Sequence, residues 1–233
     1  GEGALRKRRA QHCPICLRMH GPIALEWDLA CVCACPGHGV VLQDHCAACG
    51  HSIELFRPSW DVCICGHYLT SAAETPVVAD LAALRWCEWV AHALHPELHD
   101  LPILPREVLR ALHGLSVDGA SRIVVAFGGG QRRLDSLRLS ASQRWLTTAA
   151  VHDVVSAGMA RFQEFILTRR LAGGVPALAV ADLMNLAVVG LTADDRTRAA
   201  WLIGLLNGHR VPRRVRAAAT RQMDLFADQD GHE

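Results

Sequence analysis

The sequence lacks long apolar runs, an excess of charge of one sign and any repeat of fixed period. Its longest hydrophobic stretches are broken well before 18 residues, and its N-terminus does not resemble a signal peptide, which argues against a membrane span and against secretion. With a net charge of +1, the chain has no general basic field that would draw it to nucleic acid. The sequence therefore predicts a cytoplasmic globular protein of one large or two modest domains.

Enzyme signatures are also missing. No Ser/His/Asp array or paired carboxylate motif stands out. The glycines at 128–130 are not followed by the Gly-Lys-Ser/Thr that a phosphate-binding loop needs. Strand patterns do not extend beyond the short turns of zinc knuckles. We therefore expect a non-enzymatic, mainly α-helical protein with a small zinc-stabilised region.

Cysteine is what the sequence does contain in quantity, and it is unevenly placed. Of ten cysteines, all except Cys87 lie before residue 66. They occur in closely spaced pairs, which in a chain without a secretory signal favours metal binding over disulfides. The predicted ligands are Cys13, Cys16, Cys35, His38, Cys46, Cys49, Cys63 and Cys65.

These eight ligands form four pairs, enough for two tetrahedral zinc ions. Sequential pairing joins the first pair with the second, whereas a cross-braced arrangement, as in a RING, joins the first with the third. We prefer sequential pairing because seven residues separate the second and third pairs, against two or three in a RING. Cys31 and Cys33 crowd the same turn and are interpreted as packing residues. Because protein ligands saturate both sites, the two Zn²⁺ ions should be structural.

Helix signals dominate the sequence after the cysteine-rich region. We predict helices over Val77–Leu94, from Pro105 to Gly114, from Ser116 to the glycines at 128–130, and within 141–171. A Thr192/Asp195 capping box should begin another helix, and Pro212 a last basic one. The predicted architecture is tandem zinc knuckles followed by a helical bundle. Its parts are a basic N-terminal segment (1–11), a double zinc-finger region (12–70), a helical domain (71–221) and a C-terminal tail (222–233).

The cysteine-rich region resembles the TniQ/TnsD family, whose pattern runs CPxC, a tryptophan, CPxHGxxL, CPxCG and CxCG. The matching stretches are Cys13-Pro14-Ile15-Cys16, Trp27, Cys35-Pro36-Gly37-His38-Gly39-Val40-Val41-Leu42, Cys46-Ala47-Ala48-Cys49-Gly50 and Cys63-Ile64-Cys65-Gly66. Weaker similarity continues at Leu84-Arg85-Trp86, at Leu104-Pro105 and from Gly158 to Phe165. Ala47 replaces the usual proline without loss of a ligand. The PGES-like segment and N-terminal helix-turn-helix of the family are not seen, and since the chain begins at Gly1 rather than at methionine we expect that it is truncated.

The resemblance implies a target-selection adaptor of bacterial DNA transposition. Such proteins link a DNA site, or a CRISPR effector with its guide RNA, to an AAA+ regulator and then to the transposase. A homodimer is compatible with this role. The alternative from another class is a free-standing zinc-finger transcriptional regulator.

Local clusters of basic residues are the candidate nucleic-acid contacts, because arginines can neutralise phosphates. A helix-turn-helix over 105–127 could add Arg122, although a buried core helix is the preferred interpretation of its second helix. The candidates are Arg6, Lys7, Arg8, Arg9, Arg122, Arg213 and Arg214.

The C-terminal tail contains a further motif. The segment Gln222-Met223-Asp224-Leu225-Phe226 resembles the short peptide that binds the bacterial DNA sliding clamp, with Leu225 and Phe226 as its apolar anchors. The competing interpretation is that both side chains fold back onto the helical core.

Overall fold

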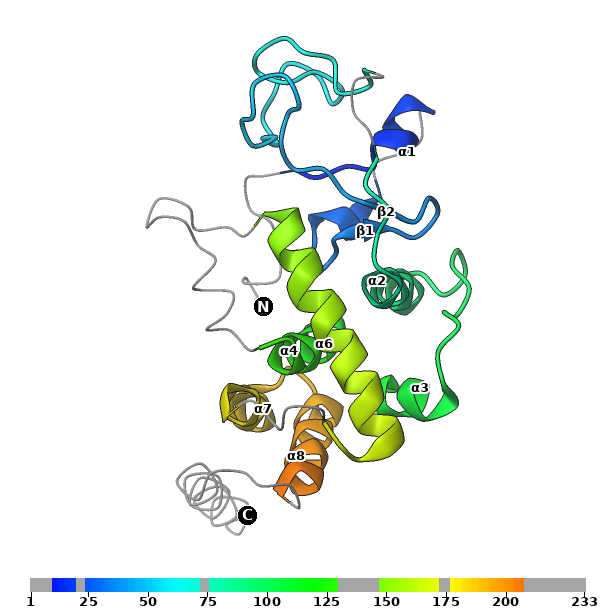
Figure 1. Cartoon of the computed structure of the whole chain (residues 1–233), viewed down its shortest axis with the longest axis vertical. Coiled ribbons are helices and arrows are strands. Elements are labelled where there is room, and N and C mark those ends of the chain that lie inside the picture. Colours follow the sequence, from blue (N-terminus) through cyan, green and yellow to red (C-terminus); the bar gives the residue numbers. More distant parts are fainter. Residues whose placement is uncertain (1–9, 20–23, 72–75, 130–146, 172–176, 208–233) are drawn as a thin grey trace, which may run out of the picture. The chain divides into compact units, whose positions relative to one another are not determined.

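The computed structural model describes residues 10–19, 24–71, 76–129, 147–171 and 177–207. These residues form a mainly helical protein (Figure 1), with seven α-helices, a short 3-10 helix and a two-stranded sheet. The predicted fold class is thereby confirmed. The elements are α1 (Pro14–Arg18), η2 (Leu25–Asp28), β1 (Ala34–Cys35), β2 (Val40–Val41), α2 (Leu81–Leu94), α3 (Arg106–Leu112), α4 (Val117–Phe127), α6 (Thr148–Thr168), α7 (Ala177–Val189) and α8 (Ala193–Asn207).

The chain divides into two compact units. The first unit comprises Gly1–Leu104 and Arg133–Ala160, and the second comprises Pro105–Arg132 and Arg161–Glu233. This division differs from a boundary at residue 70, because α2 and the first part of α6 group with the cysteine-rich region.

A small antiparallel hairpin anchors the first unit. Ala34 of β1 pairs with Val41 of β2, and Cys35 with Val40. The segment before α2 extends this sheet: the Val41 amide donates to the Val77 carbonyl at 2.8 Å, and the Ala79 amide to the Gly39 carbonyl at 2.9 Å. The prediction of a helix from Val77 was therefore wrong in its first turn, because the backbone there bonds to the hairpin. Helix α2 begins instead after Asp80, whose carboxylate accepts from the Ala82 amide at 2.8 Å.

Helix α2 packs its buried face on the hairpin and on the chain that leads into it. The Trp86 indole donates from Nε1 to the Cys31 carbonyl at 2.9 Å. The Cys87 and Cys33 thiols, both fully buried, lie 3.9 Å apart. Cys33 is thus a packing residue, as predicted, and its contact is with the one cysteine that lies outside the cysteine-rich region.

The start of α6 is tied to the cysteine-rich region by buried polar contacts. The Thr148 amide donates to Asp44 Oδ2 at 2.7 Å, and the Thr148 hydroxyl to Gln11 Oε1 at 2.8 Å. Gln11 in turn donates to the Trp27 carbonyl at 2.7 Å and to the Val32 carbonyl at 2.8 Å. Because all of these groups are removed from water, each bond positions the helix as well as satisfying a buried polar atom.

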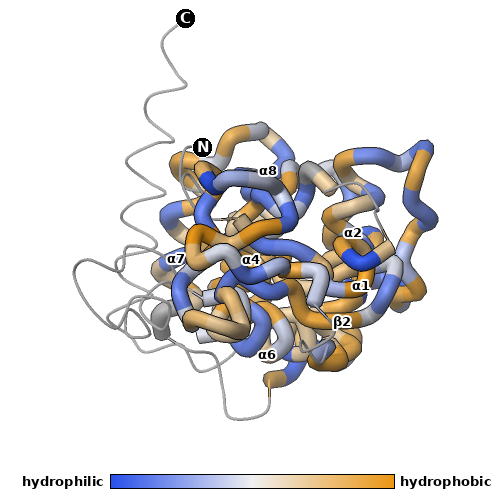
Figure 2. Tube along the Cα trace, turned by 90° about the horizontal axis from the view of Figure 1, so that it is seen from above, coloured by the Kyte–Doolittle hydropathy of each residue, from blue (hydrophilic) through white to orange (hydrophobic). Residues whose placement is uncertain are grey.

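The second unit is built from helices packed around an aromatic core. The Phe127 ring at the end of α4 lies 5.5 Å from Phe162 and 5.6 Å from Phe165 of α6. Helix α7 packs against both α4 and α8. Both hydrophobic and hydrophilic residues occur along the described helices (Figure 2). The predicted stops are confirmed: α3 ends before Gly114, which has a φ of 79° that favours glycine, and α4 ends before the glycines at 128–130.

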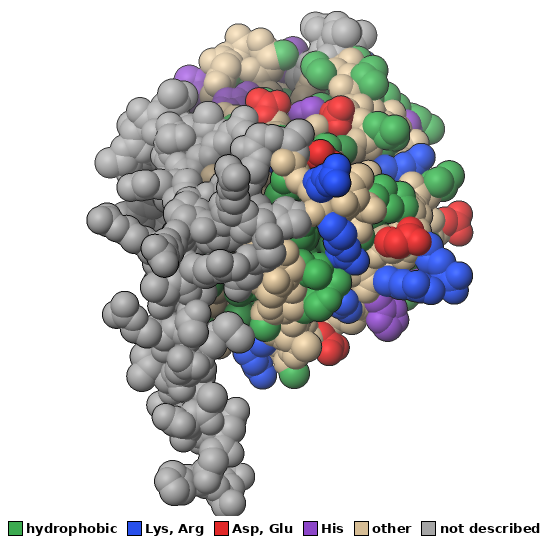
Figure 3. Space-filling view, turned by 60° about the horizontal axis from the view of Figure 1, so that its bottom comes forward, with side chains coloured by type: hydrophobic (Ala, Val, Ile, Leu, Met, Phe, Trp, Pro, Cys, Tyr) green, Lys and Arg blue, Asp and Glu red, His purple; other side chains and the backbone are tan. Residues whose placement is uncertain are grey.

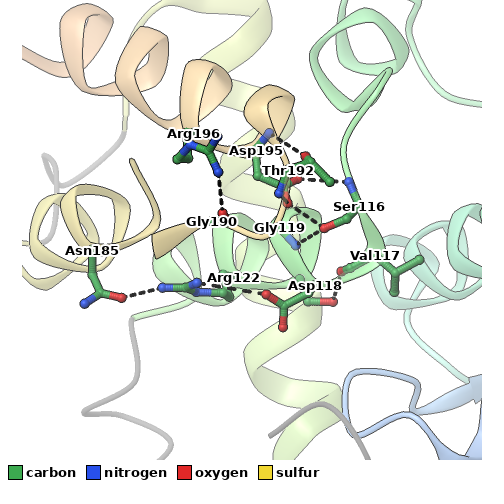
Figure 4. Close-up of polar contacts among 11 residues, drawn as sticks. Ser116, Val117, Asp118, Gly119, Arg122, Asn185, Gly190, Thr192, Asp195 and Arg196 are labelled. Carbon is green, nitrogen blue, oxygen red and sulfur yellow. Dashed lines mark hydrogen bonds and ion pairs between the residues drawn. The ribbon is translucent and has the colours of Figure 1, made fainter. Parts of the chain in front are cut away.

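A single buried carboxylate joins the N-termini of two helices in the second unit (Figure 4). Ser116 caps α4, because its Oγ accepts from the Gly119 amide at 3.0 Å. The predicted capping box of α8 is confirmed by the Asp195 amide donating to Thr192 Oγ1 at 3.0 Å and the Thr192 amide donating to Asp195 Oδ2 at 3.1 Å. Asp195 also accepts from the Ser116 amide at 2.9 Å and from its hydroxyl at 2.7 Å. Asp195 is fully buried.

Within the described residues, no helix combines the length and the apolar character needed to cross a membrane.

Candidate metal centres

The first metal centre brings together Cys13, Cys16, Cys35 and His38. Cys13 precedes α1 and Cys16 lies in its first turn, while Cys35 ends β1 and His38 lies in the turn of the hairpin. The Cys16 and Cys35 sulfurs are 3.7 Å apart, and His38 Nδ1 lies 3.2 to 3.6 Å from the three sulfurs. The helix and the hairpin therefore each supply one pair of ligands.

The second metal centre brings together Cys46, Cys49, Cys63 and Cys65. The Cys46 and Cys65 sulfurs lie 3.9 Å apart, and those of Cys49 and Cys63 lie 3.8 Å apart. The turns that carry these pairs end in glycines at positive φ, 69° at Gly50 and 84° at Gly66. A side chain at either position would strain the turn, which explains the glycine after each pair.

These spacings fit tetrahedral zinc. With Zn–S bonds of about 2.3 Å, the edge between two sulfurs of a tetrahedron is about 3.8 Å. An edge from sulfur to an imidazole nitrogen bound at about 2.0 Å is about 3.5 Å. The observed separations match both values, whereas a disulfide would need sulfurs about 2.05 Å apart. None of the ten cysteines forms a disulfide.

The two centres form by sequential pairing, so the cross-braced alternative is not the one present. Each cluster can hold one metal ion, consistent with two structural zinc sites. Four protein donors complete a tetrahedral coordination shell, which leaves no position for a water or a substrate. The chemistry that a bound zinc would supply here is the crosslinking of separate loops.

Electrostatics of the thiols explains why such clusters need a cation. Hydrogen bonding from Cys35 lowers the pKa of Cys13 to about 5, whereas burial and the negative charge of Cys13 raise the pKa of Cys16 to about 11. In the second cluster, the His67 amide lowers the pKa of Cys65 to about 7, and burial raises the pKa of Cys63 to about 12. Neighbouring thiols therefore oppose one another's ionisation, and a divalent cation removes that opposition.

The candidate nucleic-acid residues are mostly outside the described residues, namely Arg6, Lys7, Arg8, Arg9, Arg213 and Arg214. Arg122 is described, and its guanidinium donates to Asn185 Oδ1 and lies 3.9 Å from Asp118 (Figure 4). The helix that carries it has its first turn covered by Asp195. Because these partners occupy Arg122, we do not include it among the proposed nucleic-acid contacts. The clamp-like segment Gln222, Met223, Asp224, Leu225 and Phe226 also lies outside the described residues and stays a prediction.

Sequence reasoning missed one basic site in the second unit. The Arg169 and Arg198 guanidiniums lie 5.6 Å and 5.4 Å from the centre of the Trp201 ring, within cation–π range. Arg169 has a φ of 58°, an uncommon conformation for arginine, directly after α6. Arg198 and Trp201 are three residues apart on α8, a local spacing that the sequence does contain. Arg169 lies in a distant part of the sequence, so no local pattern joins it to the other two. Over the described part of the face in Figure 3, basic side chains are interspersed with acidic and apolar ones.

A groove of about 370 Å³ lies in the first unit between the first metal centre and the chain after α2. Pro36 and Gly37 form one side, and Leu98 to Ile103 the other. Its charged residues include Arg85 and Glu88, which pair with each other at 2.7 Å. His99 and Asp100 also line the groove.

Comparison with known protein families, with functionally characterised proteins and with solved structures gives no match for this chain. The metal centres are therefore interpreted from their own geometry, which is that of two structural zinc sites built from eight ligands in sequential pairs.

Proposed function

We propose that this chain is a non-enzymatic target-selection adaptor of DNA transposition, as the resemblance to the TniQ/TnsD family implies. The observation that carries the proposal is the pair of metal centres. The resemblance rests on eight cysteine and histidine positions in a fixed order, and these same residues assemble into two four-ligand clusters. A chance similarity of sequence would not require that the matched residues meet in space with tetrahedral spacing.

An adaptor acts through surfaces rather than through a reaction. In this proposal zinc holds the cysteine-rich loops in one conformation, so that their outward side chains meet a partner without first being ordered. The partners are an AAA+ transposition regulator, the transposase it recruits, and either a DNA site or a CRISPR effector with its guide RNA. Saturated coordination supports a role without catalysis by the metal.

Within the described residues, arginines of the second unit are the candidates for contact with DNA. Arg169 and Arg170 are exposed, and Arg198 is half-buried. Arg169 and Arg198 stack on Trp201, and Arg198 also donates to the His113 carbonyl at 3.3 Å. In this proposal their positive charge attracts the phosphate backbone. Contacts of this kind set position on the duplex and carry no sequence information, so a specific site would have to be recognised elsewhere.

The test is reconstitution with the AAA+ ATPase encoded beside the gene. We expect ATP-dependent association of the zinc-loaded chain with that ATPase, and targeted insertion that stops when the chain is omitted. The Cys46→Ser variant should fail in both assays, and the exposed Gly204→Ala variant should be active in both.

A transcriptional regulator would give the opposite result. It would ignore the ATPase and bind one promoter with high sequence specificity, and that outcome would refute the adaptor. The salt dependence of DNA binding tests the two arginines as phosphate contacts. The Arg169→Ala, Arg198→Ala double variant should reduce the slope of log DNA affinity against log salt concentration by about 2.

A further inference from the structure

The second metal centre carries an unusual amount of exposed apolar surface. Large hydrophobic side chains of a region this small are normally needed for its core. Here Ile53 and Leu69 are buried inward beside the ligands, while several others face solvent. The outward-facing side chains are Leu55, Phe56, Trp60, Ile64 and Tyr68, which are 42%, 84%, 44%, 52% and 62% exposed. We refer to these five residues as the aromatic face.

Backbone contacts bring these residues into one neighbourhood. Val62 forms isolated bridges with Ser59 and with Tyr68, and the Leu69 amide donates to the Asp61 carbonyl at 2.8 Å. Trp60 and Tyr68 therefore lie on adjoining stretches of backbone. Ile64 sits between the last two metal ligands, so its position is determined by the cluster itself.

Arg57 holds the loop that presents Phe56. Its Nη1 donates to the Glu54 carbonyl at 2.6 Å, and its Nε donates to the Ser59 and Trp60 carbonyls, both at 3.1 Å. Nη2 donates to the Trp60 carbonyl as well. One guanidinium thus closes the loop from Glu54 to Trp60 and keeps its most exposed aromatic side chain in place. Such pre-organisation lowers the entropy lost on binding.

The charge around the aromatic face identifies what it can bind. Residues 44–71 contain three acidic side chains and one basic one, and Arg57, the basic one, is already bonded to the loop's own carbonyls. Four thiolates around one divalent zinc add further negative charge. A phosphate backbone would be repelled here, because the acidic side chains of residues 44–71 outnumber the one arginine. A segment that combines arginine or lysine with apolar side chains would be attracted, and its cations could stack on exposed Trp60 and Tyr68.

We propose that the aromatic face is a docking site for a basic, apolar segment of a partner protein. This inference goes beyond the adaptor proposal and does not depend on it, since it follows from the exposure, rigidity and charge of this one surface. Phe56 and Trp60 are the expected anchors, because aromatic side chains at the centre of an interface carry most of its binding energy. Arg57 is a positioning residue.

The experiment is selection of a random peptide library on the immobilised zinc-loaded full chain. We expect enriched peptides that combine Arg or Lys with Leu, Phe or Trp, and binding about 30-fold weaker to Phe56→Ser with Trp60→Ser. The matched control is Ile103→Ser, which removes an 81% exposed apolar side chain from another surface of the first unit. It should bind as the parent does.

The zinc content of every variant is measured, and a value of two shows that a lost interaction is not lost folding. Arg57→Ala should retain two zinc ions and yet weaken the selected peptides, with Arg57→Lys only partly restoring them, because an ammonium cannot bond several carbonyls as a planar fork does. An Arg57→Ala variant that binds at full strength removes the positioning role.

Three results would overturn the docking site. The first is a selection without basic bias, or one whose peptides bind the Phe56→Ser, Trp60→Ser variant equally well. The second is DNA binding that depends on Phe56 and Trp60, which would assign the face to nucleic acid. The third is a concentration-dependent dimer in sedimentation that the same variant abolishes, which would assign the face to a second copy of the chain. A failed reconstitution with the ATPase would refute the adaptor proposal but would not affect the peptide-binding, DNA-binding or sedimentation results that test the docking site.

Discussion

Replacement of Gly119 by alanine should destabilise this protein, although the same change in most helices stabilises it. Glycine inside a helix normally costs about 1 kcal/mol relative to alanine. At Gly119 of α4, however, an added Cβ would lie 2.1 Å from Oδ1 and 2.3 Å from Cγ of Asp195. Asp195 is fully buried, so the clash involves a group that has no solvent to move into.

The size of the loss in unfolding free energy depends on whether the Asp195 side chain or α4 moves to relieve the clash. If the carboxylate moves, it loses the bonds it accepts from the Ser116 amide, the Ser116 hydroxyl and the Thr192 amide. Each of these part-buried donors that is left without a partner costs at most about 1–3 kcal/mol. If α4 moves instead, overpacking costs about 1–3 kcal/mol. After subtracting the gain in helix propensity, we expect a loss of about 3 kcal/mol, a large share of the total stability of an ordinary domain.

The assay is urea unfolding followed by circular dichroism, with zinc present throughout. Gly204→Ala is the matched control, because Gly204 lies in α8 and a Cβ there meets nothing within 4 Å. It should stabilise the protein by about 0.5–1 kcal/mol. Both variants should bind two zinc ions, since all eight ligands lie in the first unit.

A double-mutant cycle decides whether Asp195 is the cause. In the Asp195→Ala background the obstructing carboxylate is gone, so Gly119→Ala should stabilise the protein there by about 0.5–1 kcal/mol, as Gly204→Ala does. The reasoning is refuted if Gly119→Ala is as stable as the parent. It is also refuted if the cost of Gly119→Ala is the same in both backgrounds, because the clash would then lie elsewhere.

Three further predictions concern the first unit. Cys46→Ser should lower the zinc content, measured by mass spectrometry or a colorimetric chelator, from two ions per chain toward one, while Cys87→Ala should keep both ions because Cys87 lies outside both clusters. Asp44→Ala should destabilise the protein to urea by about 1–3 kcal/mol, because it leaves the buried Thr148 amide without its acceptor. The effect of Asp80→Ala on the melting temperature should depend on pH: bonding by the Ser156 hydroxyl lowers the pKa of Asp80 below 3.8, so its contribution should be complete above about pH 4 and shrink as the pH falls through the lower folded-state pKa. A pH-independent effect of Asp80→Ala would contradict this assignment.

The sequence was sufficient to predict those features that depend on residues close to one another in the chain. The ligand pairs, the cap at Ser116 and the Thr192/Asp195 capping box are all local patterns, and all three formed as predicted. Sequential pairing was preferred from a linker length, which is also a local quantity. The bonds from Asp195 to Ser116, in contrast, span 79 residues, and no local pattern contains them.

Two helix predictions show where local reasoning stops. Helix α7 went unnoticed because Ala177–Val189 is apolar along most of its length and has neither an amphipathic stripe nor a capping signal. The residues Val77 to Ala79 have a helical apolar pattern but form an extended segment, because the hairpin at 39–41 offers them backbone partners. In both cases a distant part of the chain decides the outcome.

The first unit extends past residue 70 because distant helices depend on the metal-bound loops. Metal ligation determines the path of the loops, and these loops in turn carry the acceptors that receive the helices. Asp44 lies two residues before the ligand Cys46 and caps the start of α6. Cys31 and Cys33 precede the ligand Cys35 and contact Trp86 and Cys87 of α2.

Because each of these contacts is within a few residues of a metal ligand, loss of zinc should release α2 and the start of α6 together with the loops. The folding of α2 and of the start of α6 should therefore depend on the zinc sites. A chelated protein whose α2 amides kept their protection from hydrogen exchange would show instead that the helices stand without the metal. The two metal centres should also differ in this respect. Loss of zinc from the first centre should expose the α2 amides more than loss from the second, since only the first has a ligand, Cys35, adjacent in sequence to the residues that contact α2.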